Sequence, residues 1–325
     1  MLRHRVSSNN EIGKTLLTEM SYTMICANDT HRSQTEPASP DTALALRSGQ
    51  IDVWVAMPGD VPDPELAAQF RWVLSDDERQ QYGKFLFEKD RRRYLTTRSL
   101  VKYALSRYVP IPPAEWRFDA TAFGRPIIIN SHPVVSNITF NISHSDQVVV
   151  LGLTRGCQLG IDVENLYRHV PVDTACSLFS AAEVRQLHAL PPAERPHCFL
   201  ALWTLKESYV KARGKGLSLP LDKFGFELSD KLRLQANFDA CLNDSPTNWT
   251  FWQWSPSQDS IAALCVENQP GIEKTITVRR TVPFVQEEEI GFNVLRVSEM
   301  SPSMFNRRGS FRSSDDRHWA WHCES

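Results

Sequence analysis

The sequence lacks the features that indicate a disulfide framework, a zinc site or a membrane span. Its seven cysteines are an odd number, are scattered, and include no C-x-x-C pair. This pattern is typical of reduced thiols in a cytosolic protein. No apolar run approaches the roughly 20 residues needed to cross a bilayer. The basic start, Met1 to Arg5, is not followed by the apolar segment of a secretory signal. We therefore expect a cytoplasmic protein that is neither secreted nor embedded in a membrane.

The chain also lacks an excess of charge of one sign. Its 36 Lys and Arg nearly balance its 38 Asp and Glu, which leaves a formal net charge of -2. Such a chain has no global field that attracts nucleic acid or membrane, so binding must depend on local patches. The length and the 42% of hydrophobic residues allow one large domain or two small ones with a real core.

Both ends have weak hydrophobic periodicity. Residues 1–49 are rich in Ser, Thr, Asn and Asp, and we expect a flexible extension there. An alternative is an upstream start codon, with Met20 or Met24 as the true beginning. Residues 291–325 are expected to form a flexible tail, because most of their sequence is polar and irregular.

Between these ends the pattern predicts alternating helices and strands. Ser75 with Glu78, and Ser180 with Glu183, have the spacing of capping boxes that begin helices. Longer helices are expected over residues 89–108 and 193–213. Strands are expected at 51–56, 137–145, 148–153, 157–163, 224–228, 248–254, 260–266 and 275–282. Nearly every residue of 260–266 is apolar, which favours a central position in a sheet.

The second long helix carries a potential site. Glu207 and Lys211 are one turn apart on one face, one turn after Trp203. On another stripe, Leu202, Leu205 and Tyr209 recur at helical spacing and should be buried; Gly214 suits the C-cap. By itself the Glu/Lys pair is equally consistent with a surface ion pair worth roughly 0.2–0.5 kcal/mol.

A second acidic pair lies on the strand Gly160-Ile161-Asp162-Val163-Glu164. Because strand side chains alternate, Asp162 and Glu164 share one face, and Ile161 and Val163 share the other. Neighbouring carboxylates repel each other unless a positive group lies between them. A hard cation such as magnesium would satisfy them with oxygen ligands, although D-x-E also occurs on exposed strands.

The first long helix is strongly basic on its polar side. The residues concerned are Arg91, Arg92, Arg93, Arg98 and Lys102. A solvated face is the ordinary interpretation of such a run. Nucleic-acid binding is less well supported, because the patch has no interleaved exposed aromatics and the chain is not basic overall.

These motifs together resemble a known family. G-I-D-V-E followed by W-T-L-K-E-S-x-x-K, from Trp203 to Lys211, closely resembles the signature of 4'-phosphopantetheinyl transferases of the Sfp type. The resemblance extends to G-K-G-L-S-L-P-L after Gly214, to N-I-S-H-S from Asn141 to Ser145, and to Gly124-Arg125-Pro126. It covers about residues 51–285.

The resemblance implies an α+β fold of two similar halves related by a pseudo-two-fold, with the ligand site between them. The chain would then divide into an N-terminal half, 50–157, and a C-terminal half, 158–290, which carries the metal-binding motifs. No internal repeat is visible in the letters themselves. A monomer is expected.

The resemblance also implies an activity and residue roles. The enzyme would transfer 4'-phosphopantetheine from coenzyme A to a serine of an acyl or peptidyl carrier protein, as in polyketide or nonribosomal peptide synthesis. Asp162, Glu164 and Glu207 would bind Mg²⁺, or Mn²⁺, and Glu207 and Lys211 would be catalytic. The implied coenzyme contacts are Arg93, Arg125, Ser143, His144, Lys206 and Lys211. Arg125 replaces the family's commoner lysine.

Two rival functions are compatible with the same residues. A magnesium-dependent phosphodiesterase or nuclease also needs clustered carboxylates and a lysine, but would act without coenzyme A. A catalytically silent protein that binds coenzyme A or a carrier is disfavoured, because the three acidic positions and Lys211 are all present.

Overall fold

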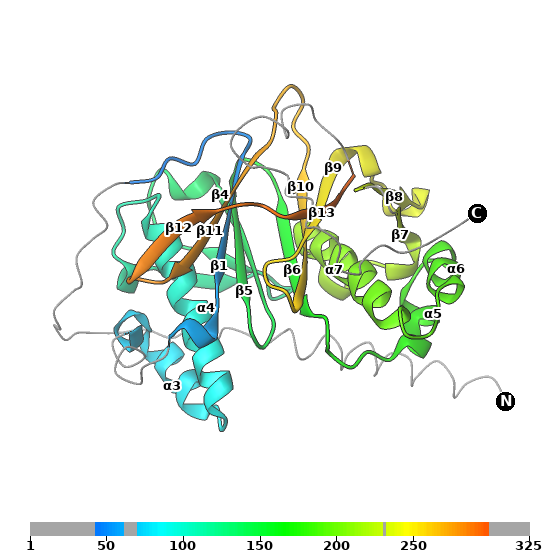
Figure 1. The fold of residues 1–325 in the computed structure, drawn as a ribbon. Helices are drawn as coiled ribbons and strands as arrows, with labels where there is room; N and C mark the ends of the chain where they lie inside the picture. Colours follow the sequence, from blue (N-terminus) through cyan, green and yellow to red (C-terminus); the bar gives the residue numbers. More distant parts are fainter. Residues whose placement is uncertain (1–42, 62–69, 230–231, 299–325) are drawn as a thin grey trace.

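The computed structural model describes residues 43–61, 70–229 and 232–298. Most of the predicted extension, residues 1–42, and of the predicted tail, residues 299–325, therefore lies outside the described residues. Within them the chain forms two main sheets with a long helix against the outer face of each (Figure 1). None of the described helices combines the length and the apolar character that a bilayer-spanning segment requires.

The first sheet has the strand order β12-β11-β1-β5-β4. Its strands are β1 (Gln50–Ala56), β4 (Ile138–His144), β5 (Val149–Arg155), β11 (Thr275–Val282) and β12 (Gln286–Ile290). The helices α3 (Asp76–Lys84) and α4 (Glu88–Ser106) accompany it, together with the small hairpin β2 (Phe118–Ala120) and β3 (Pro126–Ile128).

The second sheet has the order β13-β9-β10-β6. Its strands are β6 (Leu159–Asn165), β9 (Trp249–Trp254), β10 (Ser260–Glu267) and β13 (Val294–Val297). It is accompanied by α5 (Ala175–Leu178), α6 (Ala181–Ala189), α7 (Arg195–Arg213), and the hairpin β7 (Phe224–Leu228) and β8 (Leu234–Phe238). The central position predicted for the apolar strand 260–266 is confirmed, since β10 lies between β9 and β6.

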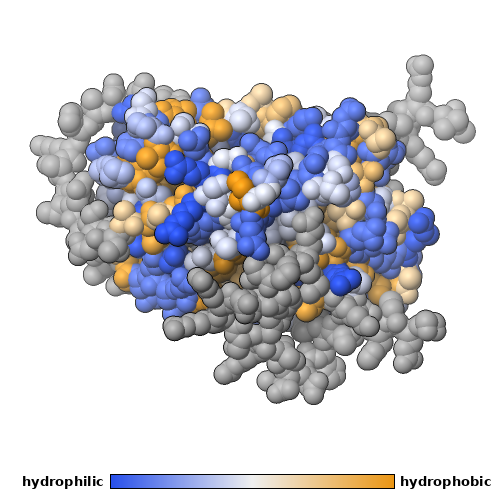
Figure 2. All heavy atoms as spheres, turned by 90° about the horizontal axis from the view of Figure 1, so that it is seen from above, coloured by the Kyte–Doolittle hydropathy of each residue, from blue (hydrophilic) through white to orange (hydrophobic). Residues whose placement is uncertain are grey.

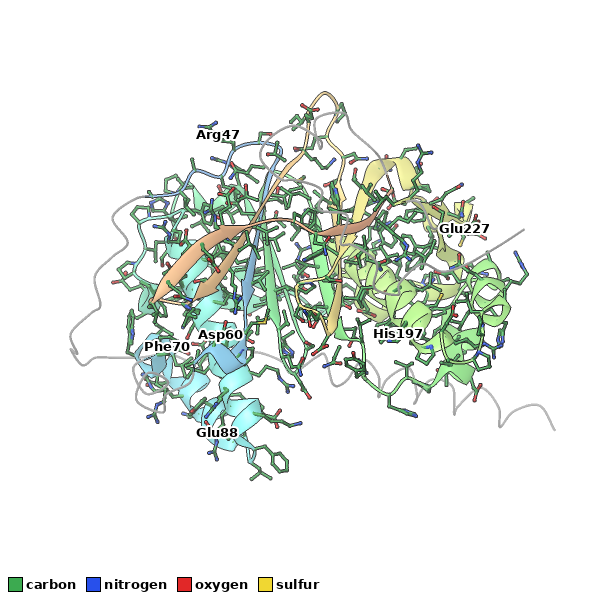
Figure 3. All side chains as sticks on the ribbon, viewed as in Figure 1. Arg47, Asp60, Phe70, Glu88, His197 and Glu227 are labelled. Carbon is green, nitrogen blue, oxygen red and sulfur yellow. The ribbon has the colours of Figure 1, made fainter. Side chains whose placement is uncertain are left out.

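The two halves repeat one order of elements. Each has a strand, a short helix, a helix of 19 residues, a small hairpin and two further strands. The corresponding strands are also arranged alike, as β1-β5-β4 and as β6-β10-β9, with antiparallel pairing throughout. In Figure 3, Glu88 and His197 mark the beginnings of the two long helices, on opposite sides of the molecule. The expected α+β class with two similar halves is confirmed.

The repeat extends to polar interactions in the core. Both predicted capping boxes are present, at Ser75 with Glu78 and at Ser180 with Glu183. In each half the capping glutamate also pairs with a buried lysine on the long helix: Lys102 lies 2.6 Å from Glu78, and Lys206 lies 2.8 Å from Glu183. Lys102 was expected on the polar face of its helix; this expectation is wrong, because its side chain is only 1% exposed.

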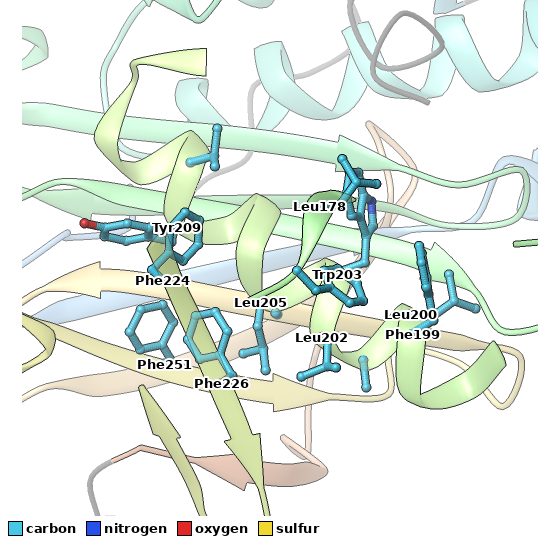
Figure 4. Packing of buried hydrophobic residues seen from close by; sticks show 14 of the residues in the cluster. Leu178, Phe199, Leu200, Leu202, Trp203, Leu205, Tyr209, Phe224, Phe226 and Phe251 are labelled. Carbon is cyan, nitrogen blue, oxygen red and sulfur yellow. The ribbon is translucent and has the colours of Figure 1, made fainter. Parts of the chain in front are cut away.

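Three apolar layers hold the elements together. One lies between α4 and the first sheet, and a second lies between the two sheets and includes Val53 of β1 and Leu264 of β10. The third packs α7 against the second sheet and β7, as Leu202, Leu205, Tyr209 and Phe251 show in Figure 4. The buried stripe predicted for this helix is therefore confirmed, and Gly214 ends it with a left-handed φ of 61°.

The strands near the C-terminus differ from the expected division of the chain. β11 and β12, which were assigned to the C-terminal half, belong to the first sheet, where β11 pairs in parallel with β1. The flexible tail expected from residue 291 is also wrong at its start, because Val294–Val297 pairs with β9. Parallel pairing between such distant segments has no local signal in the sequence.

The surface has no large continuous apolar face in the view from above. Hydrophilic residues cover most of the described atoms there, and hydrophobic residues occur in small groups between them (Figure 2). Singly exposed apolar residues of this kind are ordinary for a folded protein.

Candidate functional site

Close packing between β6 and α7 positions the candidate site. A Cβ atom at Gly160 would lie 2.0 Å from the Ser208 carbonyl oxygen and 2.4 Å from the Ala212 nitrogen. Only glycine therefore allows the helix to approach the strand this closely. Because strand side chains alternate, Asp162 and Glu164 lie on the same side of β6 as Gly160. Both acidic side chains thus face the helix that carries Glu207 and Lys211.

Asp162 lies at the centre of a polar network that joins three elements. Lys211 of α7 lies 2.7 Å from Asp162 Oδ1, and Ser143 of β4 donates to the same oxygen at 2.9 Å. Lys211 also donates to the Ser143 hydroxyl at 3.0 Å and to the Ile161 carbonyl at 3.2 Å. The structure thus brings together Ser143, Asp162 and Lys211, which the sequence places far apart.

Glu207 is buried beside this network without a full set of partners. Its side chain lies close enough to Asp162 and Lys211 to interact electrostatically with both. Among the residues that the structure describes, neither Glu207 Oε1 nor Asp162 Oδ2 has a hydrogen-bond partner. Burial first, and then repulsion from Asp162, raises the pKa of Glu207 to about 8. Two unsatisfied carboxylate oxygens in a buried acidic site are a favourable environment for a cation.

Glu164 has a different partner. Arg168, in the turn after β6, donates from Nη1 to both of its carboxylate oxygens, at 2.8 and 2.9 Å. Burial and then Asp162 raise the pKa of Glu164 to about 7, while Arg168 opposes this rise. The sequence reasoning missed Arg168, because a basic residue four positions after an acidic one in an irregular segment is not a recognisable signal.

Two side chains of β4 join the two sheets. The Asn141 side-chain oxygen accepts the Ile161 N–H at 3.0 Å, and Ser143 Oγ accepts the Val163 N–H at 3.4 Å. These bonds replace part of the ladder that β4 and β6 would share within a single sheet. Asn141 was quoted only as part of a motif; its role in aligning β6 became visible only with the fold.

His144 and Arg93 extend the site along the first sheet. His144, at the end of β4, is buried; desolvation, and then the positive charges of Arg93 and Lys211, lowers its pKa to about 4. Arg93 of α4 pairs with Asp90 at 3.0 Å and with Asp146 at 2.6 Å. Positive groups from both long helices therefore approach one imidazole.

Arg125 approaches the site from the hairpin side. It donates to the Gln158 side chain at 3.0 Å and, at 3.5 Å, to the carbonyls of Leu159 and Ala212. This places the guanidinium at the junction of β6 with the end of α7. Its position is compatible with a role at the edge of the same site.

Lys206 is not part of this arrangement, which corrects the expectation that it contacts the coenzyme. Its side chain is 0% exposed, pairs with Glu183 at 2.8 Å and donates to the Leu221 carbonyl at 2.8 Å. The ammonium also lies 4.5 Å from the centroid of the Phe224 ring. Its position in the sequence beside Glu207 suggested the site, but successive helical residues face different directions.

The side chains of Asp162, Glu164 and Glu207 are not arranged as the ligands of a metal ion. In residues 43–61, 70–229 and 232–298, no group of three or more His, Cys, Asp or Glu side chains is placed to hold a metal ion. Lys211 and Arg168 instead neutralise Asp162 and Glu164. The donor chemistry nevertheless suits a hard cation, since three carboxylates face one region and two of their oxygens are unsatisfied.

Comparisons with known proteins agree with the motifs. Residues 158–265 match the 4'-phosphopantetheinyl transferase superfamily, and residues 62–154 match a family described as 4'-phosphopantetheinyl transferase, N-terminal. HetI of Nostoc sp., named a 4'-phosphopantetheinyl transferase, is 29% identical over 69% of this chain and 90% of its own. The Sfp transferase of Bacillus subtilis strain 168 is 33% identical over 49% of this chain and 69% of its own.

A further 4'-phosphopantetheinyl transferase from Bacillus subtilis is 34% identical over 49% of this chain and 68% of its own. The two family matches cover both the helix α4 and the β6–α7 unit, which are the parts that build the site. The chain therefore belongs to the 4'-phosphopantetheinyl transferase family and is similar to its Sfp-type members.

Proposed function

We propose that this protein transfers the 4'-phosphopantetheine arm of coenzyme A to a serine hydroxyl of a carrier protein. In this reaction the serine oxygen forms a bond to the phosphorus that bears the pantetheine. The bond from that phosphorus to the other pyrophosphate group breaks, and adenosine 3',5'-bisphosphate leaves. The serine proton passes to a base, so atoms and charge balance.

The observation that carries this proposal is the meeting of Asp162, Glu207 and Lys211 between β6 and α7. In the metal-free site, burial and then Asp162 raise the pKa of Glu207 to about 8, and a bound cation would lower it. Glu207 would take the serine proton directly or through a water. Lys211 would stabilise the negative charge that develops on the leaving bisphosphate.

The positive and polar groups around this centre would hold the coenzyme. Arg93, Ser143 and His144 would contact its phosphates, while Arg125 would contact its nucleotide end. An arginine can grip a phosphate with two charge-assisted bonds, so Arg93 would exchange its present partners Asp90 and Asp146 for the ligand. A phosphate beside His144 would raise the pKa of the imidazole from its value of about 4.

Asp162, Glu164 and Glu207 would hold a magnesium or manganese ion. When bound, the metal would act as a Lewis acid toward the pyrophosphate and neutralise part of its charge. The support for this assignment is chemical: three buried carboxylates, two oxygens without a partner among the described residues, and pKa values of Glu164 and Glu207 that are raised by burial and then by repulsion from Asp162. Lys211 and Arg168 would then give up part of their contact with these carboxylates.

The partners we propose are acyl or peptidyl carrier domains of polyketide or nonribosomal peptide synthases.

We further propose that the protein is a monomer and acts in the cytoplasm. Its two halves would meet at residues 157 and 158. Light scattering on the purified protein would test the monomer, and a mass that doubles would contradict it.

The test of the activity is to incubate the protein with an apo carrier protein, coenzyme A and magnesium, and then to weigh the carrier. A gain of one phosphopantetheine supports the transferase. No gain together with tight binding of coenzyme A would favour the silent binder, and nucleotide release from nucleic acid without coenzyme A would favour the nuclease.

A further inference from the structure

The turn after β6 holds an arginine against one of the acidic residues. Leu166 donates its backbone N–H to the Asp259 carbonyl at 2.8 Å, and the Asn165 side chain accepts the Tyr167 N–H at 2.8 Å. The Arg168 N–H bonds to the Asn165 carbonyl at 3.1 Å. The turn is thus fixed by hydrogen bonds and directs Arg168 back toward the end of the strand.

Glu164 differs from Asp162 and Glu207 because both of its carboxylate oxygens accept hydrogen bonds from a cationic side chain. Arg168 bonds both oxygens of Glu164, at 2.8 and 2.9 Å, and the side chains are 26% and 6% exposed. In contrast, Asp162 Oδ2 and Glu207 Oε1 have no hydrogen-bond partner within the described part of the chain. Glu164 is therefore the one carboxylate of the three whose oxygens are both already used.

We propose that Arg168 competes with the divalent cation for Glu164 and thereby sets the metal concentration at which the site fills. The proposal depends on the proposed function, because it concerns the metal site of that reaction. It goes further by assigning a role to a residue outside the motifs that identify the family.

The physical basis is charge. Three carboxylates close together and mostly out of water repel one another, so a metal-free site needs a positive group to remain stable. Arg168 supplies that charge from a partly exposed position, from which it can swing into solvent. When the ion binds Glu164, the guanidinium must withdraw, and this opposes metal binding.

Two effects of opposite sign follow from removing Arg168. Arg168→Gln should bind the ion more tightly, because both Glu164 oxygens become available and a nearby positive charge is lost. The same variant should unfold more easily without metal, because the acidic cluster has lost a neutralising partner. A residue that merely oriented Glu164 would give weaker metal binding when removed, and a merely structural residue would leave metal affinity unchanged.

The experiment is Mn²⁺ binding, measured by calorimetry and by electron paramagnetic resonance, on the full chain without coenzyme A. All variants are compared in the same buffer at the same pH. For Arg168→Gln we expect the Kd for Mn²⁺ to fall by on the order of tenfold. Arg168→Lys keeps the positive charge on a different side chain, so its Kd for Mn²⁺ should lie between that of Arg168→Gln and that of the wild type, and this variant guards against a folding failure.

Arg79→Gln is the matched control. Arg79 forms an exposed ion pair with Asp76 at 2.5 Å, on α3 in the other half of the chain. Its replacement should leave the Kd for Mn²⁺ unchanged. If Arg168→Gln binds Mn²⁺ with an affinity equal to or weaker than that of the wild type, the proposed competition is wrong.

Absence of Mn²⁺ binding to every form at millimolar concentration would overturn both the competition and the metal assignment. The carrier-mass assay remains a separate test of the transfer reaction, so failure of the present inference alone leaves that assay positive.

Discussion

At the scale of single residues, the site depends on buried carboxyl groups whose surroundings differ. Asp162 has a lysine and a serine within hydrogen-bonding distance, Glu164 has an arginine, and Glu207 has an oxygen with no partner. Burial raises the pKa of Glu207 to about 8 and that of Glu164 to about 7, so of these two carboxyl groups Glu207 holds its proton more tightly. Glu207 is thus the one carboxylate that we propose both as a metal ligand and as the acceptor of the serine proton, directly or through a water.

We expect Asp162→Asn and Glu207→Gln each to lower kcat by roughly 100-fold or more, since a positioned acid or base typically contributes such a factor. The measurement is carrier modification followed by mass spectrometry. Asp52→Asn is a matched control, because Asp52 is also completely buried but bonds Gln50 and Tyr108 in the first half. It should lower stability while kcat is retained. Normal turnover in either site variant would refute these roles.

The pH dependence of stability gives a second prediction. Burial and Asp162 raise the pKa of Glu207 to about 8 from its ordinary 4.5, so the folded chain keeps a proton that the unfolded chain has released between these values. The free energy of unfolding should therefore fall as pH rises from about 5 to 8 in metal-free protein. Glu207→Gln should flatten this slope in urea titrations.

His144 contributes in the opposite sense. Burial and the charges of Arg93 and Lys211 lower its pKa to about 4 from 6.5, so stability gains from this group as pH rises between those values. Both the wild type and Glu207→Gln contain His144, so its contribution cancels when the pH slopes of their free energies of unfolding are subtracted. Identical slopes in the two proteins would contradict the raised pKa of Glu207.

Lys206 provides a third prediction. Removing one member of a buried ion pair leaves the other charge unpaired and costs about 3–5 kcal/mol. Lys206→Met and its counterpart in the other half, Lys102→Met, should both lower the free energy of unfolding in urea, while the Kd for coenzyme A stays within about twofold. Weaker coenzyme binding with unchanged stability in Lys206→Met would restore the original expectation of a ligand contact.

At the scale of elements, the contact between β6 and α7 determines the geometry of the site. Gly160 allows the helix to rest on the strand, and the two-residue period of the strand then places Asp162 and Glu164 against the helix. On the opposite face, Ile161 and Val163 enter the layer between the sheets. One strand thus supplies an acidic face and an apolar face.

Gly160→Ala should separate these two elements. The added methyl group would overlap backbone atoms of Ser208 and Ala212, which cannot move without moving the helix. We expect a loss of about 1–3 kcal/mol, as for other overpacked sites, and a large loss of kcat. Gly83→Ala is the control, because nothing lies within 4 Å of its added Cβ. Full activity in Gly160→Ala would show that the strand–helix distance is not critical.

The sequence predicts many elements but not all of their partners. Helix ends are local events, so the capping boxes at Ser75 and Ser180 and the C-cap at Gly214 are visible in the letters. The strand Thr275–Val282 is visible too, but its parallel pairing with β1 is not. Such pairing depends on contacts between distant segments, which single-sequence patterns do not encode.

In the candidate site, too, the sequence predicts the local arrangement of side chains but not the contacts between distant segments. The alternation in Gly160 to Glu164 predicts the shared face of the two carboxylates, and helical spacing predicts that Glu207 and Lys211 face one direction. Lys206 and Arg168 were misjudged or missed, because their roles depend on Glu183 and Glu164 meeting them in three dimensions. The family resemblance and the position beside Glu207 suggested a ligand contact for Lys206, and neither gave a signal for Arg168.

At the scale of the whole molecule, the layer between the two sheets joins the halves into one cooperative unit. Leu264 and Val53 come from different sheets and are both completely buried in it. Leu264→Ala should cost about 2–5 kcal/mol, the usual range for a large core residue. Thermal unfolding followed by tryptophan fluorescence and by far-UV circular dichroism should still show one shared, lowered midpoint.

Two separate transitions in that experiment would mean that the halves unfold independently. Leu86→Ala is a suitable control, because Leu86 is 85% exposed and its loss should leave the midpoint nearly unchanged.

The parallel pairing of β1 with β11 has a consequence for biosynthesis. A ribosome delivers Gln50 long before Thr275, so a growing chain must wait for most of its length before the inner edge of β1 is covered. Until then that edge offers unpaired amide and carbonyl groups to other nascent chains. Slow or interrupted translation beyond β10 should therefore favour aggregation, and a chaperone that shields strand edges should raise the yield.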